Sequence, residues 1–221
     1  MQRSSAPASL VLTRLLRRYG TVLAAILIIA VFSVLSPSAF FSVGNVINVS
    51  RQISFLVIIA LAATVVMVVG EFDLSVGAVA SLGGVVAAQL AVRGVPVGLC
   101  FALAAGTGVV IGLVNGLLIT RFRLLSFITT LAMGTVLGGL TFWLTGGSTV
   151  FENVPERFSA LGRATLLGVP ALSVLMLAIT VLAWFLLTQT PVGRRLYAVG
   201  GNEVAARLAG VATDWHKTLA F

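Results

Sequence analysis

Two acidic residues, Glu71 and Asp73, stand between two long apolar runs of the sequence. Asp73 comes directly before the second run, where an aspartate suits a helix N-cap, because its carboxylate accepts backbone N–H bonds and complements the helix dipole. The alternative is that the two carboxylates bind a cation or a proton. No residue next to them in the sequence supplies further ligands, so we expect Glu71 and Asp73 to cap a helix.

A second polar segment, residues 190–211, follows the last long apolar run. We expect a turn, a short basic stretch, a break at the double glycine and then a short helix. Asparagine is a favourable N-cap, glutamate suits the first turn, a Glu–Arg pair four residues apart stabilises a helix, and glycine is a natural C-terminal stop. The residues in these roles are Asn202, Glu203, Arg207 and Gly210.

The expected short helix carries a narrow apolar stripe, formed by Val204, Leu208 and Val211 at positions i, i+4 and i+7. Such a stripe is typical of a helix that enters a groove on a protein partner. The alternative is a helix that lies on anionic lipid. The stripe is narrow and the helix contains small residues, Ala205 and Ala206, which favours the protein partner.

The chain has few other groups that could do chemistry. Cys100 and His216 are its only cysteine and histidine, so neither has a partner for an intrachain disulfide or a His–Cys metal site. Cys100 lies in an apolar run and fits a small buried residue. A P-loop needs glycines before its lysine, but the only lysine, Lys217, follows His216. We therefore expect no metal, no cofactor and no ATP binding in this chain.

The composition indicates whether the surface of the protein faces water or lipid. Of the 221 residues 59% are hydrophobic and only 9% are charged, whereas soluble domains carry about 25% charged residues. So few charges cannot cover a water-facing surface of this size. This excludes an ordinary cytosolic enzyme, a secreted disulfide scaffold and a disordered tail, and it predicts a polytopic membrane protein.

Six apolar stretches reach the length of about 20 residues that a membrane-spanning helix needs; they are residues 20–36, 53–70, 74–92, 95–120, 124–145 and 166–188. A seventh run starts at Thr218 and the sequence stops at Phe221, so we expect a chain truncated at its C-terminus. The predicted fold is an all-α transmembrane bundle of about six spans. The expected parts are a cytoplasmic tail, the bundle, a cytoplasmic loop and the start of a further span, at 1–19, 20–188, 189–217 and 218–221.

The basic residues predict the orientation in the membrane. The net charge is +8, and of the 14 basic residues only four fall in the loops that would face outward if the N-terminus is cytoplasmic: Arg51, Arg93, Arg157 and Arg163. Basic residues are enriched on the cytoplasmic side. We therefore expect a cytoplasmic N-terminus, with Glu71 and Asp73 at the membrane edge. Nucleic-acid binding is not favoured, because the basic residues do not cluster on one face.

One predicted span carries glycines at four-residue spacing, namely Gly108, Gly112 and Gly116. This spacing places them on one helix face, where other backbones can approach closely. We expect tight packing within the bundle rather than a specific dimer face. Asn115 lies between two of the glycines, and an amide in a membrane must find a partner or line a wet cavity. It is therefore a candidate pathway residue.

Taken together, the segments 70–77 and 200–210, with 112–118 and 144–147 between them, resemble the membrane permease subunit of ribose-type ABC importers. The resemblance runs from about the second span to the end of the chain, and the order and spacing of the segments make it specific. It implies a bacterial inner-membrane permease without enzymatic activity, in which residues 202–210 form the helix that couples to an ATPase. Relatives of this kind usually have several more spans.

The resemblance also implies partners: a cytoplasmic ATP-binding subunit that holds ATP and Mg²⁺, a second copy or a paralogue of the permease, and a periplasmic sugar-binding protein. The expected function is import of a ribose-like or xylose-like monosaccharide by alternating access. The alternatives are import of branched-chain amino acids, ion-coupled secondary transport through Glu71 and Asp73, and a membrane scaffold without transport. Ion-coupled transporters place ionisable residues near the middle of their spans, and the six spans here lack them.

Overall fold

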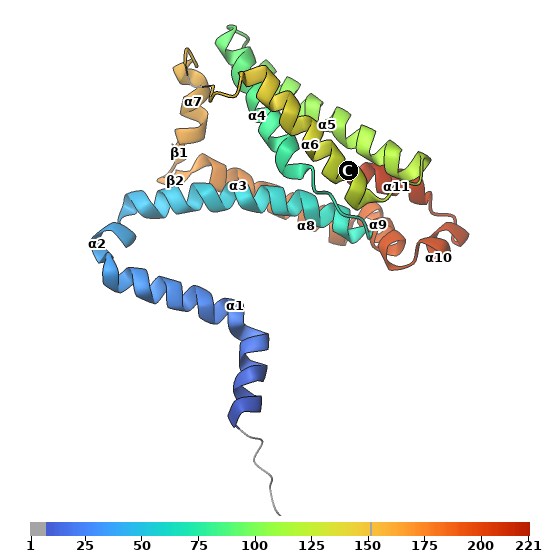
Figure 1. Ribbon diagram of the computed structural model, residues 1–221, viewed down its shortest axis with the longest axis horizontal. Helices are drawn as coiled ribbons and strands as arrows, with labels where there is room; N and C mark the ends of the chain where they lie inside the picture. Colours follow the sequence, from blue (N-terminus) through green and yellow to red (C-terminus); the bar gives the residue numbers. More distant parts are fainter. Residues whose placement is uncertain (1–7, 151) are drawn as a thin grey trace, which may run out of the picture. The chain divides into compact units, whose positions relative to one another are not determined.

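The computed structural model describes residues 8–150 and 152–221, except for the side chains of residues 8–16 and 161. Figure 1 shows that the described chain consists of helices and one short hairpin. The expected all-α class is confirmed. The chain divides into two compact units, Met1–Ser50 and Arg51–Phe221, which are described separately.

The first unit contains α1 (Ala8–Leu35), α2 (Pro37–Phe40) and the beginning of α3 (Val43–Val68). Helix α1 stops just before Pro37, which occupies the first helical position of α2, where its missing N–H costs nothing. The stretch Arg17–Leu35 is apolar and long enough to cross a membrane. Part of the expected N-terminal tail is helical, because α1 already begins at Ala8.

The second unit contains the remainder of α3 and all later elements. These are α4 (Val76–Val92), α5 (Val97–Arg121), α6 (Ser126–Thr145), α7 (Glu156–Arg163), β1 (Thr165–Leu166), β2 (Val169–Pro170), α8 (Ala171–Gln189), α9 (Pro191–Gly201), α10 (Glu203–Leu208) and α11 (Thr213–Ala220).

Five helices of the described chain are long and apolar enough to span a membrane, namely α1, α3, α5, α6 and α8. Helix α4 is apolar but has only 17 residues, so the span count is five to six. It is shorter than expected because residues 69–75 before it are not helical. The last expected span also begins late, at Ala171, because residues 165–170 form the antiparallel β1–β2 hairpin.

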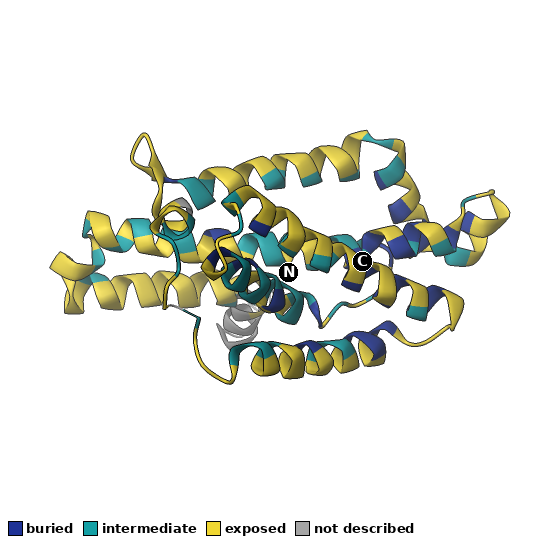
Figure 2. Cartoon of the chain, turned by 90° about the horizontal axis from the view of Figure 1, so that it is seen from above, coloured by how far each residue is buried: buried dark blue, intermediate teal, exposed yellow. Residues whose placement is uncertain are grey.

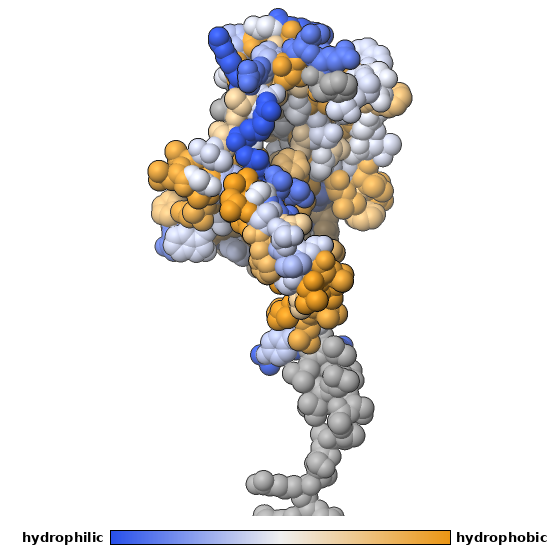
Figure 3. Space-filling view, turned by 90° about the vertical axis from the view of Figure 1, so that its left-hand side faces the viewer, coloured by the Kyte–Doolittle hydropathy of each residue, from blue (hydrophilic) through white to orange (hydrophobic). Residues whose placement is uncertain are grey.

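Helices α4, α5 and α6 pack together around Leu82, Ile111 and Leu137, one from each helix. Most large apolar side chains of the second unit are nevertheless exposed, as the predominance of exposed residues in Figure 2 and the uncovered hydrophobic side chains in Figure 3 show. Lipid tails are as apolar as leucine, so such side chains need no cover of protein in a membrane. The protein core is therefore confined to a few helix contacts.

The glycine face of α5 packs against α11. A Cβ atom on Gly116 would come within 2.8 Å of the Thr218 Cα atom, and one on Gly112 would collide with the Phe221 carbonyl. Gly108 makes only an ordinary contact with Val79. Gly112 and Gly116 thus serve close packing within one chain. Helix α11 begins at Thr213 rather than at the expected residue 218.

In residues 190–211 the expected turn and basic stretch form helix α9, and the break expected at the double glycine falls directly after it, at Asn202. Helix α9 contains Gly200 and ends at Gly201. Asn202, which follows, is the C-cap of α9 and the N-cap of α10. A Cβ atom on Gly200 would collide with the Val68 carbonyl oxygen. The physical reason for this glycine is the close approach of α9 to the end of α3.

Candidate functional site

The connection between α3 and α4, residues 69–75, contains no helix, yet side chains of α6 bind its backbone. The Phe72 N–H donates to Ser126 Oγ at 3.2 Å, and the Leu74 N–H donates to Thr130 Oγ1 at 3.0 Å. The Thr130 hydroxyl also lies 3.3 Å from the Phe72 carbonyl oxygen. Backbone polar groups outside helices and strands need hydrogen-bond partners when they are buried, and α6 supplies them for Phe72 and Leu74.

Asp73 stands two residues before the backbone N-cap of α4, which is Ser75. Its Oδ1 atom accepts bonds from the Ser75 N–H at 2.7 Å and from the Ser75 hydroxyl at 2.6 Å. The carboxylate therefore binds the backbone just before the helix, although it is not the N-cap residue itself.

The hydrogen bonds of Asp73 continue into α5. The Asn115 side-chain amide donates to Ser75 Oγ at 3.0 Å, and Asn115 is 1% exposed. Its Oδ1 atom is buried without a hydrogen-bond partner in the part of the chain that the structure describes. A cavity of about 400 Å³ is lined by Asp73 and Asn115, together with Gly108 and Gly112 of the glycine face. The cavity thus presents a carboxylate and an amide among apolar walls.

Glu71 does not cap a helix, contrary to expectation. Its Oε1 atom accepts a hydrogen bond from Lys217 Nζ at 2.7 Å, and the two side chains are 15% and 13% exposed. The cause is a tertiary contact that brings α11 beside the α3–α4 connection. Sequence reasoning missed Lys217 as a site residue, because no local pattern pairs it with Glu71.

The short helix α10 has the local features that its sequence predicts. Asn202 Oδ1 accepts the Ala205 N–H at 2.9 Å, and Arg207 donates to Glu203 at 2.8 Å. Gly210, at a φ of +82°, follows the helix in the left-handed conformation that glycine adopts readily.

The two faces of α10 differ in their surroundings. Ala206 is buried against α9 and the end of α3, whereas Ala205 is exposed. Val204 and Leu208 are 69% and 85% exposed. Val211 instead packs toward the core, so the exposed stripe is narrower than expected. Helix α10 is held on one side and presents two uncovered apolar side chains on the other.

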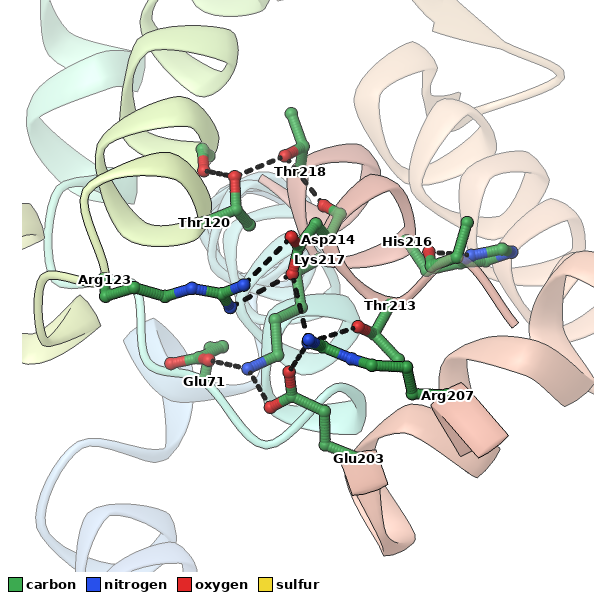
Figure 4. A network of polar contacts seen from close by, with 12 residues as sticks. Glu71, Thr120, Arg123, Glu203, Arg207, Thr213, Asp214, His216, Lys217 and Thr218 are labelled. Atoms are coloured by element: carbon green, nitrogen blue, oxygen red, sulfur yellow. Dashed lines mark hydrogen bonds and ion pairs between the residues drawn. The ribbon is translucent and has the colours of Figure 1, made fainter. Parts of the chain in front are cut away.

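A network of ion pairs joins α10 to neighbouring segments (Figure 4). Lys217 Nζ lies 2.8 Å from Glu203 as well as 2.7 Å from Glu71. Arg207 contacts Asp214 at 3.5 Å, and Asp214 pairs with Arg123 at 3.1 Å. Three segments meet through these contacts: the α3–α4 connection, the α5–α6 connection, and the stretch that contains α10 and α11.

Lys217 and Glu203 shift each other's pKa. The hydrogen bond from Lys217 lowers the pKa of Glu203, against the opposing effect of burial, and the charge of Arg207 adds to the lowering. Burial by itself lowers the pKa of Lys217, but the bonds and charges of Glu203 and Glu71 outweigh it, so the pKa lies above its ordinary value. Both groups are therefore charged at neutral pH.

The contacts agree with the expected alternation of the chain across a membrane. Glu71, Arg123 and Asp214 belong to three segments predicted to lie on one side, and the network joins them. Arg51 and Arg163 belong to segments predicted on the other side, and the Arg51 guanidinium donates to the Arg163 carbonyl at 2.8 Å.

Cys100 and His216 lie in the protein interior, where each contacts a carbonyl of its own neighbourhood. Cys100 Sγ lies 3.4 Å from the Val95 carbonyl, and His216 Nδ1 lies 2.8 Å from the Ala212 carbonyl. Within residues 8–150 and 152–221, no group of three or more His, Cys, Asp or Glu side chains could hold a metal ion.

Comparison with known proteins places the chain among transport proteins. Residues 45–221 match the family described as branched-chain amino acid transport system / permease component. The ribose import permease protein of Haemophilus influenzae is 35% identical over 94% of this chain and 65% of its own length, and that of Bacillus subtilis is 36% identical over 93% and 64%. The D-allose transport system permease protein of Escherichia coli is 32% identical over 92% and 63%.

The chain thus spans somewhat less than two thirds of the length of these relatives. No solved structure matches it. The family match covers most of the chain, including the α3–α4 connection, α10 and α11. The chain therefore belongs to the branched-chain amino acid transport system / permease component family.

Proposed function

We propose that this chain acts in the permease subunit of an ATP-driven importer, which moves a ribose-like or xylose-like monosaccharide across the bacterial inner membrane by alternating access. The main support for the proposal is sequence similarity to ribose and D-allose permeases, which extends over more than 90% of the length of this chain. The apolar helices provide the membrane part. The N-terminus is cytoplasmic, so the network around α10 faces the cytoplasm.

The proposed partners are a cytoplasmic ATP-binding subunit that holds ATP and Mg²⁺, a second permease copy or a paralogue, and a periplasmic sugar-binding protein. Helix α10 is the contact to the ATP-binding subunit. The buried Ala206 and the ion pairs hold this helix from one side, while Val204 and Leu208 remain uncovered on the other. A rigidly held helix with an uncovered apolar stripe fits a groove on a protein partner.

The proposed pathway includes the cavity beside Asp73 and Asn115. A hydroxylated solute carries hydrogen-bond donors, and the carboxylate of Asp73 in the cavity lining is an acceptor for them. The apolar walls supply the surface over which the carbon skeleton can pass. This arrangement supports a small polar solute as the cargo.

The decisive experiment reconstitutes the full-length permease with its ATP-binding subunit in proteoliposomes and measures uptake of radiolabelled ribose with the sugar-binding protein supplied. The expected result is uptake that requires ATP and that unlabelled ribose, but not leucine, competes away. Competition by leucine alone would support the amino-acid alternative. Uptake driven by a cation gradient without the ATP-binding subunit would overturn the proposal.

The docking role of α10 is tested with Leu208→Glu, whose matched control is Leu167→Glu at the exposed tip of the β1–β2 hairpin. Truncation of an important interface residue costs more than about 1 kcal/mol of binding free energy. Leu208→Glu should therefore lower co-purification of the ATP-binding subunit about tenfold, and the control should not. Equal co-purification of both variants would exclude α10 as the contact.

A further inference from the structure

We infer that Lys217 is a positioning residue that transmits the movement of α10 to the α3–α4 connection, and thereby to Asp73. The inference rests on the proposed function, because it concerns how the ATP-binding subunit controls the pathway. Its basis is the position of the Lys217 ammonium group, 2.8 Å from Glu203 of α10 and 2.7 Å from Glu71 of the connection.

This double contact is the direct electrostatic link between the two segments. In the part of the chain that the structure describes, Glu71 forms no ion pair except that with Lys217. The Glu71 and Lys217 side chains are largely buried, so salt screens this pair less than an exposed one. In the Arg123–Asp214 pair both side chains are about half exposed, so this pair contributes less electrostatic energy to holding the segments together.

The connection can move without unfolding a helix. Residues 69–75 lack helical structure, and two of their N–H groups bond to side-chain hydroxyls of α6 rather than to helix carbonyls. A cavity of about 640 Å³ lies beside the link, with Glu71, Glu203 and Lys217 among its lining residues. The surroundings therefore leave space into which the linked side chains can shift.

Glu71 is only two residues before Asp73, which lines the cavity of the proposed pathway. A displacement of Glu71 is therefore passed on to Asp73. Asp73 is held by Ser75, and Ser75 is held by the Asn115 amide that lines the other cavity. If the Lys217 charge is removed, Glu71 and Glu203 lose their common cation and repel each other. The connection then separates from α10, so that ATP hydrolysis no longer moves Asp73.

The test compares Lys217→Met with the wild-type permease in the complete reconstituted transporter. Sugar uptake and ATP hydrolysis are measured together, so that the number of sugars moved per ATP is obtained. The matched control is Arg195→Met, which removes an exposed charge from α9 that forms no ion pair among the described residues. Lys217→Arg, which keeps the charge, is the rescue variant.

Side chains along a coupling route change coupling by factors of about 2 to 30. Lys217→Met should therefore lower the number of sugars per ATP about tenfold, while hydrolysis changes less than about twofold. Lys217→Arg should restore at least half of the ratio, and Arg195→Met should leave it unchanged. Glu71→Gln should reproduce the loss, and the double variant Glu71→Gln/Lys217→Met should be no worse than either single variant.

The outcomes separate this inference from the proposed function. If wild-type uptake requires ATP but Lys217→Met keeps the wild-type ratio, the inference alone is overturned. If uptake and hydrolysis fall in parallel, Lys217 has a merely structural role and the inference also fails. Should Lys217→Met not reach the membrane, Glu71→Gln, which leaves the Lys217–Glu203 pair in place, decides the question. Wild-type uptake without ATP would overturn the proposed function and the inference together.

Discussion

Lys217 and Glu71 are 146 positions apart in the sequence, and their Nζ and Oε1 atoms lie 2.7 Å apart. The contact joins α11 to a connection that is not helical, and a second bond of the same ammonium group reaches α10. Through one side chain, the loop that we propose as the contact to the ATP-binding subunit touches the segment that contains Asp73.

Gly200→Ala should destabilise the protein, because its Cβ atom would collide with the Val68 carbonyl where α9 meets α3. Overpacking of this kind costs about 1–3 kcal/mol. Gly201→Ala is the matched control, since nothing lies within 4 Å of its added Cβ atom. Thermal unfolding of the detergent-purified variants measures the difference. Equal midpoints would show that α9 and α3 do not approach each other this closely.

Gly116→Ala should weaken the packing of α11 on α5, because the added Cβ atom meets Thr218 backbone and side-chain atoms. The cost should again be about 1–3 kcal/mol. Gly138→Ala in α6 has open space and should be neutral or should stabilise its helix by about 0.5–1 kcal/mol. Limited proteolysis near α11 provides the measurement. Cleavage at the wild-type rate in Gly116→Ala would contradict the prediction.

Thr130→Val removes the acceptor of the Leu74 N–H while it preserves the shape of a fully buried side chain. A buried donor left without a partner costs about 1–3 kcal/mol. Thr135→Val is the control, because the Thr135 hydroxyl bonds only to its own helix at Leu131. Thermal unfolding should show a loss for Thr130→Val alone. A similar loss in both variants would assign the effect to α6 itself rather than to the connection.

The pairing of Glu203 with Lys217 predicts a broad pH plateau of stability. Because the pKa of Glu203 is lowered from its ordinary 4.5, its contribution is present above that value and is lost as the pH falls through the folded-state pKa. The pKa of Lys217 is raised above its ordinary 10.5, so its contribution is present below that value and is lost as the pH rises through the folded-state pKa.

The stability difference between wild type and Lys217→Met should therefore stay constant from about pH 5 to about pH 10 and shrink outside this range. Thermal unfolding of both proteins across the range provides the measurement. A difference that changes steeply near neutral pH would mean that a group other than these two controls the contact.

Local features of this protein could be predicted from the sequence. Asn202, Glu203, Arg207 and Gly210 act within a few residues of one another, so their types and spacing were enough to predict the cap, the ion pair and the helix end. The membrane-spanning helices follow in the same way from continuous apolar runs, since hydropathy over about 20 residues needs no tertiary information.

Features that depend on tertiary contact could not be predicted. Glu71 has the position of a cap residue in the sequence, but α11 brings Lys217 next to it. The double glycine marks the end of α9, as its composition predicts, but the close approach of Gly200 to the end of α3 is a tertiary contact. In both cases a distant segment, which no local pattern reveals, decides the outcome.

The composition of the α10–α11 region also makes the proposed link observable by simple chemistry. Lys217 is the only lysine among the 221 residues, so an amine-reactive acylating reagent has a single side-chain target in this sequence. Acylation requires a free, uncharged amine, and the two carboxylates keep the amine charged and largely covered. The rate at which this lysine is labelled therefore measures how often Glu71 and Glu203 release it, and a change in that rate on adding nucleotide to the assembled transporter would report the motion directly.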